Sequence, residues 1–284
     1  MRSSVLIVNW RTSALLRRLL ESLGQFPPAG EHEVIVVDNA SDDFELARFE
    51  RDFPSVKFLP QTRNLGFARG NNLALEHSTG EHILLLNPDT EVTDGALETL
   101  VRFLQSHPKA AIASAQLLFP DGSVQDSCRS FPWPAGIFFT ATRLHRVFPQ
   151  SRIVGSYRMT WFDHLHTRQV DQPMATCWAI PRRVIEDIGF MDEQFPILFN
   201  DVDWAWRAKE AGYEIWFVAE ARVWHVGGQG TKKGGAAIFR HSHDGLMRFY
   251  AKHWKGRCFA PGLWLASAIS WTNCMWRTAM AKRG

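Results

Sequence analysis

The stretch LLLNPDT, from Leu84 to Thr90, decides how the rest of this chain is interpreted. Three consecutive leucines are typical of a strand that is buried on both faces, as in a parallel sheet. Pro88 ends the strand because its ring fixes φ, and it disfavours a helical conformation for Asn87. A carboxylate, Asp89, then follows at the tip of the strand. It belongs either to a simple Asn-Pro-Asp turn or to a ligand-binding site.

Strand and helix patterns alternate along the chain on both sides of this stretch. Strands are predicted at residues 4–10, 33–38, 55–60, 82–89, 110–119, within 173–181 and within 213–228. Helices are predicted at residues 12–24, 66–78, 94–108, 182–189 and 200–212. This alternation indicates an α/β fold, a Rossmann-like, mostly parallel sheet with helices on both faces. Ligands bind at the carboxyl ends of the strands in such sheets, where Asn9, Asp38 and Asp89 lie.

Composition limits the classes of protein to consider. The 284 residues, of which 45% are hydrophobic, suffice for one large domain with or without an appendage. A net charge of +3 does not suggest a nucleic-acid-binding protein. The four cysteines form no C-x-x-C pair and indicate neither a zinc knuckle nor a disulfide framework. The N-terminal apolar stretch is too short for a signal peptide, so a cytoplasmic protein is predicted.

The pattern changes twice toward the C-terminus. Residues 121–171 are rich in proline and aromatic residues and are interpreted as a long excursion over the site. Residues 228–257 are basic, and residues 258–276 carry no charge but are too polar for a good membrane span. This tail predicts either a helix in the membrane interface, peripheral at the inner face of the plasma membrane, or packing on the domain or a second subunit. We therefore predict a domain over 1–230 and a helical extension over 231–284.

Four acidic or histidine positions are candidates for chemistry, and each also has a structural interpretation. Asp38 either caps a turn, which its own segment favours, or accepts hydrogen bonds from a nucleoside. Asp89 is suited to Mg²⁺ or Mn²⁺, which take one or two carboxylates together with phosphate oxygens. In the segment that opens the helix at 200–212, Asn200 or Asp201 caps the helix and Asp203 suits its dipole, or one of these carboxylates is a general base. His225 is either structural, as a lone histidine usually is, or part of a site covered by the glycine-rich loop with Gly227, Gly228 and Gly230, which is interpreted as a mobile lid.

The segment NLGFARGNN, residues 64–72, has neither the Gly-Lys-Ser/Thr ending of a P-loop nor the dinucleotide G-x-G-x-x-G pattern. It is interpreted as a helix start that brings backbone amides and Arg69 near a phosphate.

The ordered set of motifs resembles the inverting family 2 glycosyltransferases, and the branch with rhamnosyltransferases and galactofuranosyltransferases in particular. The motifs are VLIVNW, VIVVDNAS, NLGFARGNN, LLLNPDTEV, ATCWAIPRR and the segment 189–228, and the resemblance covers about residues 4 to 230. It implies the GT-A fold, a nucleotide-diphosphate sugar donor (a dTDP- or UDP-sugar, with rhamnose the expected sugar) and a divalent cation, Mg²⁺ or Mn²⁺. It also implies a glycan or lipid-linked acceptor in the biosynthesis of cell-surface polysaccharide.

The resemblance also assigns roles to residues. Asp201 is the expected catalytic base, and Asp89 and His225 are the expected metal ligands. The expected nucleotide- and donor-binding residues are Asn9, Asp38, Asn39, Asn64, Phe67, Arg69, Asn71 and Asn87. The expected acceptor contacts are Trp178, Asp203 and Trp204, although tryptophans of this kind more often pack in a core.

Two departures from the family pattern motivate an alternative. The D-x-D motif reads Asn87-Pro88-Asp89, so one carboxylate is missing, and Asn200 stands where many relatives have Glu. A non-catalytic, nucleotide-sugar-binding scaffold subunit is therefore the competing hypothesis. A nucleotidyltransferase is disfavoured because no glycine-rich loop with Lys or Arg lies between Trp10 and Leu15.

Overall fold

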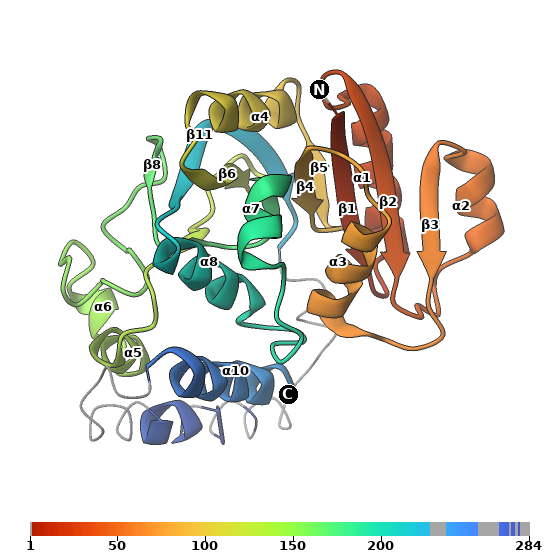
Figure 1. Ribbon diagram of the computed structural model, residues 1–284. Coiled ribbons are helices and arrows are strands. Elements are labelled where there is room, and N and C mark those ends of the chain that lie inside the picture. Colours follow the sequence, from red (N-terminus) through yellow and green to blue (C-terminus); the bar gives the residue numbers. More distant parts are fainter. Residues whose placement is uncertain (1, 228–236, 255–266, 273, 276–277, 279–284) are drawn as a thin grey trace.

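The computed structural model describes residues 2–227, 237–254, 267–272, 274, 275 and 278. Its centre is a nine-stranded sheet with the order β3-β2-β1-β4-β10-β6-β11-β5, in which β8 also pairs with β11 (Figure 1). The strands of this sheet are β1 Arg2–Asn9, β2 Glu31–Asp38, β3 Val56–Pro60, β4 His82–Leu86, β5 Thr90–Val92, β6 Ala110–Leu118, β8 Arg168–Gln169, β10 Cys177–Pro181 and β11 Glu214–His225. The short strands β7 Cys128–Arg129 and β9 Gln172–Pro173 pair separately.

Six strands run parallel, which confirms the predicted mostly parallel α/β sheet. Strands β1, β2, β3 and β4 are parallel neighbours, and β6 and β11 are parallel to each other. The sequence did not predict that β10 runs antiparallel between β4 and β6, or that β5 and β8 run antiparallel to β11. Direction depends on the connections between strands, and an apolar run alone does not reveal it.

Helices cover both faces of the sheet (Figure 1). The helices are α1 Ser13–Gln25, α2 Leu46–Asp52, α3 Gly66–Glu76, α4 Ala96–Ser106, α5 Pro134–Ala141, α6 Leu144–Val147, α7 Arg182–Ile188, α8 Asn200–Glu210 and α10 Ala237–His253. One core cluster joins one face of the central strands to α1, α2 and α4. The other joins the opposite face to α3, α7, α8 and α10. Both faces of β4 are therefore buried, as the run of leucines predicts.

The chain after β4 turns sharply and forms β5, a three-residue strand that the sequence did not predict. The amide of Asn87 donates to the carbonyl of Thr176 at 2.9 Å, so the predicted strand 82–89 ends at Leu86. Strand β5 pairs antiparallel with the end of β11, with Thr90 opposite His225. The turn that carries Asp89 is thereby fixed against the last residue of a strand from much later in the chain.

The excursion between β6 and β10 contains α5, α6 and a series of turns. The amide of Ser130, before α5, donates to the carbonyl of Tyr157, after α6, at 3.1 Å, so the two ends of this helical part lie together. In Figure 1 α5 and α6 lie at one side of the molecule, next to α10. The Tyr250 hydroxyl of α10 donates to the carbonyl of Pro132 at 2.6 Å, which fixes the excursion to that helix.

Helix α10 packs into the second core cluster through Leu246, Phe249, Tyr250 and Trp254. Its close approach requires Gly245, because a Cβ atom there would lie 2.7 Å from the ring of Phe199. The predicted domain boundary at residue 230 lies outside the described residues, and so do Gly228 and Gly230 of the predicted lid.

Most of the predicted uncharged tail, 258–276, also lies outside the described residues. Its residues 267–272 are helical, and Ser270 Oγ lies 3.0 Å from His243 Nδ1 of α10. Among the described residues, no helix combines the length and the apolar character that a membrane span requires.

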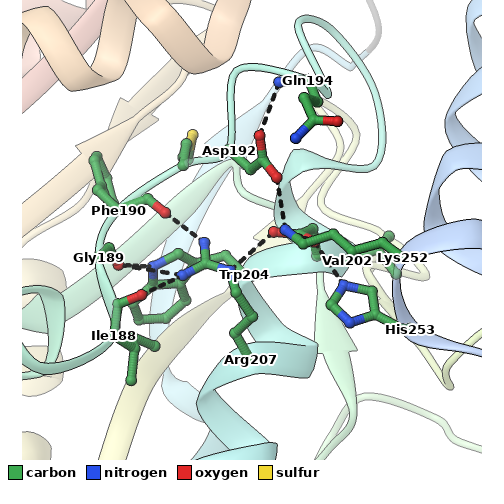
Figure 2. A network of polar contacts seen from close by, with 12 residues as sticks. Ile188, Gly189, Phe190, Asp192, Gln194, Val202, Trp204, Arg207, Lys252 and His253 are labelled. Atoms are coloured by element: carbon green, nitrogen blue, oxygen red, sulfur yellow. Dashed lines mark hydrogen bonds and ion pairs between the residues drawn. The ribbon is translucent and has the colours of Figure 1, made fainter.

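A buried carboxylate fastens the C-terminal end of α10 to α8 (Figure 2). Asp203 is fully buried, and its Oδ1 lies 2.7 Å from both Lys252 Nζ and His253 Nε2. Its Oδ2 accepts a hydrogen bond from Arg207 Nε at 2.9 Å. Lys252 also pairs with Asp192 at 2.6 Å, which adds the loop before α8 to the network.

The charge balance of this network sets the pKa of Asp203. Burial alone would raise this pKa, but hydrogen bonds from His253 and Lys252 and the charge of Arg207 outweigh it, so the pKa lies below its ordinary value. A carboxyl group with a depressed pKa stabilises the fold above its unfolded pKa, and this stabilisation is lost as the pH falls through the folded pKa.

We expect Asp203→Asn to lower the free energy of unfolding at pH 7 by about 2–3 kcal/mol. The cost is below that of a fully buried pair because Lys252 and Arg207 reach solvent. The difference in Tm between wild type and variant should shrink as the pH is lowered through the carboxyl range. Asp52→Asn is the matched control, because Asp52 pairs with Arg17 and Arg51 on the surface, and its loss should lower the free energy of unfolding far less than the loss of Asp203. Equal losses of unfolding free energy in Asp203→Asn and Asp52→Asn would contradict the role of Asp203 in holding α10 to α8.

Candidate active site

A cavity of about 460 Å³ lies at the carboxyl ends of β1, β2, β4 and β11. Seven of the predicted site residues line it, namely Asn39, Asn64, Phe67, Asn87, Asp89, Asp201 and His225. The first turn of α10 closes it with Ala237, Ile238 and His241. Most of the other lining residues are apolar, among them Trp10, Met174, Ile197 and Leu198. The strand tips, the start of α8 and the start of α10 thus meet around one space.

Asp89 and His225 lie together in this cavity, both almost fully buried. His225 Nε2 is 3.4 Å from Asp89 Oδ1, and the amide of Val226 donates to the carbonyl of Asp89 at 3.0 Å. Gln125 fixes the imidazole, because its Nε2 donates to the carbonyl of His225 at 2.6 Å and its Oε1 lies 2.8 Å from Nδ1. An amide oxygen can only accept, so Nδ1 carries the proton. In the neutral imidazole the lone pair of Nε2 then faces the carboxylate of Asp89.

This arrangement fits a divalent cation. A lone pair and a carboxylate oxygen that face each other repel unless a proton or a cation lies between them. Ligands of an octahedral ion at about 2.1 Å are about 3.0 Å apart, close to the spacing observed here. Asn87 Oδ1 is buried, has no hydrogen-bond partner among the described residues and belongs to the same cavity lining. Asp89, His225 and Asn87 can therefore supply three ligands, and diphosphate oxygens and water can supply the rest.

The ligand set is small. No group of three or more His, Cys, Asp or Glu side chains with metal-binding geometry occurs among the described residues. The site offers one carboxylate, one imidazole and one amide oxygen, so a cation bound there would need further ligands from water or from a bound molecule.

Asp201 lies in the first turn of α8, partly buried in the cavity lining. The Val202 amide donates to its Oδ1 at 2.9 Å, and Gln172 Nε2 donates to its Oδ2 at 3.3 Å. Burial raises the pKa of Asp201 because these hydrogen bonds do not offset the loss of hydration. A carboxylate with a raised pKa is a stronger base, which suits the predicted role as proton acceptor.

Asn200 has a positioning role that a glutamate could not fill in the same way. Its Nδ2 donates to the carbonyls of Phe195 and Ile197 at 3.2 and 3.0 Å. A carboxylate has no donor for these two carbonyls unless it is protonated. The helix N-cap is Phe199, in a left-handed conformation with φ 70°, and not Asn200 or Asp201. Asn200 therefore fixes the loop before α8 to the start of that helix, next to Asp201.

The ends of β1 and β2 form the polar wall next to the cavity. Asp38 accepts hydrogen bonds from Asn9 Nδ2 at 2.7 Å and from the Ser41 amide at 3.0 Å, which is the turn-capping role. Asn39 Nδ2 donates to the carbonyl of Gly66 at 3.0 Å, and Asn64 Oδ1 accepts from the Gly66 amide at 2.8 Å. Asn9 and Asp38 are buried behind the residues that line the cavity. A nucleoside contact by Asp38 stays a prediction.

Helix α3 differs from the predicted phosphate-binding helix start. The amides of Phe67 and Ala68 donate to the carbonyl of Pro196 at 2.7 and 3.3 Å. Arg69 pairs with Glu76 and Glu193 beside a separate hollow of about 300 Å³. Asn71 is buried and donates to the carbonyl of Phe67. Arg69 and Asn71 thus have protein partners in this structure, and their predicted donor contact stays a prediction.

The three predicted acceptor contacts do not line the cavity. Trp178 and Trp204 are fully buried, and Trp204 Nε1 donates to the carbonyl of Gly189 at 2.9 Å. Asp203 belongs to the ion-pair network with α10. The structure gives these side chains packing and ion-pairing roles in place of acceptor contact, because no face of them is exposed to a ligand.

Three residues at the site were missed by sequence reasoning. Gln125 lies in the predicted excursion and Gln172 directly after it, where the irregular pattern gives no positional signal. His241 belongs to α10, where it follows Ala237 and Ile238 on the face that meets the cavity. For His241, the helical spacing from Ala237 and Ile238 was the only sequence signal that could have indicated its place at the site.

Comparison with known proteins identifies the class to which this fold and site belong. The sequence model described as "Glycosyl transferase family 2" matches residues 4–168, more than half of the chain. The chain belongs to this family, as the order of its motifs predicts. An N-acetylglucosaminyl-diphospho-decaprenol L-rhamnosyltransferase of Mycobacterium tuberculosis is 25% identical over 285 residues, which cover 92% of this chain and 87% of that protein.

Solved structures confirm the GT-A fold. The mannosyltransferase PcManGT from Pyrobaculum calidifontis, in complex with GDP-Man and Mn²⁺, superimposes with a TM-score of 0.60 at 18% identity. The match covers 99% of this chain and 73% of that chain. GalNAc-T7 with UDP, GalNAc and Mn²⁺ gives a TM-score of 0.60 at 15% identity, over 79% of this chain and 44% of that chain.

We expect Gln125→Leu to weaken Mn²⁺ binding by about 10–100-fold, measured by calorimetry in the presence of UDP. The substitution removes the acceptor that holds the His225 proton on Nδ1. Gln116→Leu is the matched control, because Gln116 is also buried and also donates to a histidine carbonyl, that of His164. Unchanged affinity in Gln125→Leu, or the same loss in both variants, would contradict the role of Gln125.

Proposed function

We propose that this chain is a metal-dependent, inverting glycosyltransferase that moves a sugar from a nucleotide-diphosphate donor to a hydroxyl group of a glycan or lipid-linked acceptor. The observation that carries the proposal is one cavity that contains both halves of the required chemistry. Asp201, whose pKa is raised by burial, is the base. Asp89, His225 and Asn87 are the groups for a cation and a diphosphate.

Proton transfer and sugar transfer take place together in this scheme. Asp201 accepts the proton of the acceptor hydroxyl as that oxygen attacks the anomeric carbon. The bond from the anomeric carbon to the diphosphate oxygen breaks, and the diphosphate leaves with the electron pair. A single displacement inverts the anomeric configuration. Gln172 and the Val202 amide hold the carboxylate of Asp201 in orientation throughout.

Asp89 and His225, with Asn87 Oδ1, would hold the divalent cation, which when bound neutralises charge on the diphosphate leaving group. Gln125 keeps the imidazole of His225 in the tautomer that leaves Nε2 free for this role. Because only one carboxylate is available, affinity for the cation should depend strongly on the bound diphosphate.

Rhamnose activated by dTDP is the donor that we propose. The rhamnosyltransferase of M. tuberculosis, aligned over most of both chains, supports this choice. The largely apolar lining, with Trp10, Met174 and Ile197, suits a deoxysugar with few polar groups on one face. By the same likeness, a lipid-linked diphospho-sugar in cell-surface polysaccharide biosynthesis is the proposed acceptor.

We expect Asp201→Asn to lower kcat by about 10²–10⁴-fold in a sugar-transfer assay with Mn²⁺ or Mg²⁺ and a panel of nucleotide sugars. In wild type, kcat/KM should fall on acidification through an apparent pKa above the ordinary carboxyl value of about 4, since protonated Asp201 cannot act as the base. Asp94 is an exposed carboxylate outside the cavity. Its variant Asp94→Asn is the control and should have the same kcat as wild type.

The Tm of Asp201→Asn shows whether a loss of activity comes from the missing base or from a destabilised fold. Since burial raises the folded pKa of Asp201, ionisation of this group opposes folding at neutral pH. The variant should therefore have the same Tm as wild type or a higher one. Transfer at the wild-type rate by Asp201→Asn would contradict the proposed base. Metal-dependent nucleotide binding by wild type without turnover on any acceptor would instead favour the scaffold subunit.

A further inference from the structure

The excursion between β6 and β10 exposes an unusual combination of side chains. From Ser127 to Phe162 the chain has five arginines and no acidic residue. Four large apolar residues of this segment are exposed, with exposed fractions of 50% for Trp133, 66% for Val147, 55% for Phe148 and 74% for Ile153. Three of the arginines, Arg143, Arg146 and Arg152, are exposed within the same segment. We call these seven residues the α5–α6 face.

The segment beneath this face is firmly held. Hydrogen bonds close its base between Ser130 and Tyr157, and its inner turns between Thr160 Oγ1 and the carbonyl of Pro149 at 2.6 Å. Trp133 packs at a tilt against Trp254, directly after α10, with ring centroids 4.2 Å apart. The apolar side chains of the face are therefore presented by an ordered support and do not belong to an unfolded loop.

We propose that the α5–α6 face docks on the headgroup region of an anionic lipid bilayer. Arginine side chains with exposed aliphatic and aromatic neighbours are the combination that binds at a bilayer interface. Anionic headgroups attract the guanidinium groups, while Phe148, Val147 and Ile153 enter the acyl boundary. Tryptophan is enriched at this depth, which suits Trp133. The absence of acidic residues across the segment removes the repulsion that would oppose this contact.

The position of the face connects it to the cavity. Helix α10 contacts the excursion through Trp254 and Tyr250 at one end and lines the cavity through Ile238 and His241 at the other. In Figure 1 α5, α6 and α10 lie along the same side of the molecule. Docking through this face would hold the cavity close to the membrane surface. The value of this placement rests on the proposed function, because a lipid-linked acceptor would lie in the membrane. The docking itself does not depend on it.

The test is co-sedimentation of the full chain with two kinds of vesicle, phosphatidylcholine with phosphatidylglycerol and phosphatidylcholine alone. We expect binding to the anionic vesicles that weakens as salt is added, and little binding to the neutral ones. Two double variants, Phe148→Ser with Ile153→Ser and Arg146→Glu with Arg152→Glu, should each bind about tenfold more weakly or worse. Arg48→Glu with Arg51→Glu on α2, at the other end of the sheet, makes the same change of charge and should bind like wild type.

Several outcomes would overturn the proposal. The first is a wild-type protein that does not bind anionic vesicles. The second is a pair of face variants that both bind like wild type, which would transfer the role to another surface such as the C-terminal tail. A concentration-dependent dimer that the face variants abolish, without vesicle binding, would make the face an interface between copies of this chain. Transfer to a water-soluble acceptor should be unchanged in the face variants, so failure of docking is distinguishable from failure of the proposed chemistry. A thermal melt of each variant excludes misfolding.

Discussion

The antiparallel pairing of β5 with β11 is the constraint on which the candidate site depends. Strand β5 has three residues, yet its register sets Thr90 opposite His225. Asp89, directly before it, is thereby held 3.4 Å from the imidazole of a residue far along the chain. The antiparallel strand β10 supports the same turn, because the Thr176 carbonyl before it accepts the Asn87 amide. Backbone hydrogen bonds, and not the side chains alone, fix the two proposed metal ligands.

Helix α8 carries two carboxylates in its first turn, and their surroundings divide their roles. Asp201 faces the cavity without a cationic partner in the hydrogen bonds described, and burial raises its pKa. Asp203 is surrounded by Lys252, His253 and Arg207, and its pKa is lowered. Asp201 is thereby suited to the proposed role of base, while Asp203 ties α10 to the domain. Because α10 also closes the cavity with Ile238 and His241, the network around Asp203 links the stability of the C-terminal part to the shape of the site.

Much of the fold and part of the site could be predicted from the sequence, for physical reasons. The buried leucines of β4 and the alternation of strand and helix patterns depend on local burial, which residue type reveals. Asp89 and Asp201 follow strong breaks in pattern, and both line the cavity. The direction of β10 and the existence of β5 depend on pairing with distant strands. Trp178 and Trp204 lie in the core, and the sequence leaves both this role and acceptor contact open because residue type cannot distinguish an aromatic wall from a core. Gln125 lies in an irregular segment, and only the folded chain brings it to His225.

Pulsed EPR of Mn²⁺ bound together with UDP tests most directly whether one carboxylate and one imidazole hold the ion. We expect a nitrogen hyperfine coupling in the wild-type protein that is absent in His225→Gln. Asp89→Ala should lose most of the bound Mn²⁺. Mn²⁺ that binds wild type and His225→Gln equally well, with no nitrogen coupling in either, would contradict the assignment of His225 and Asp89 to one ion.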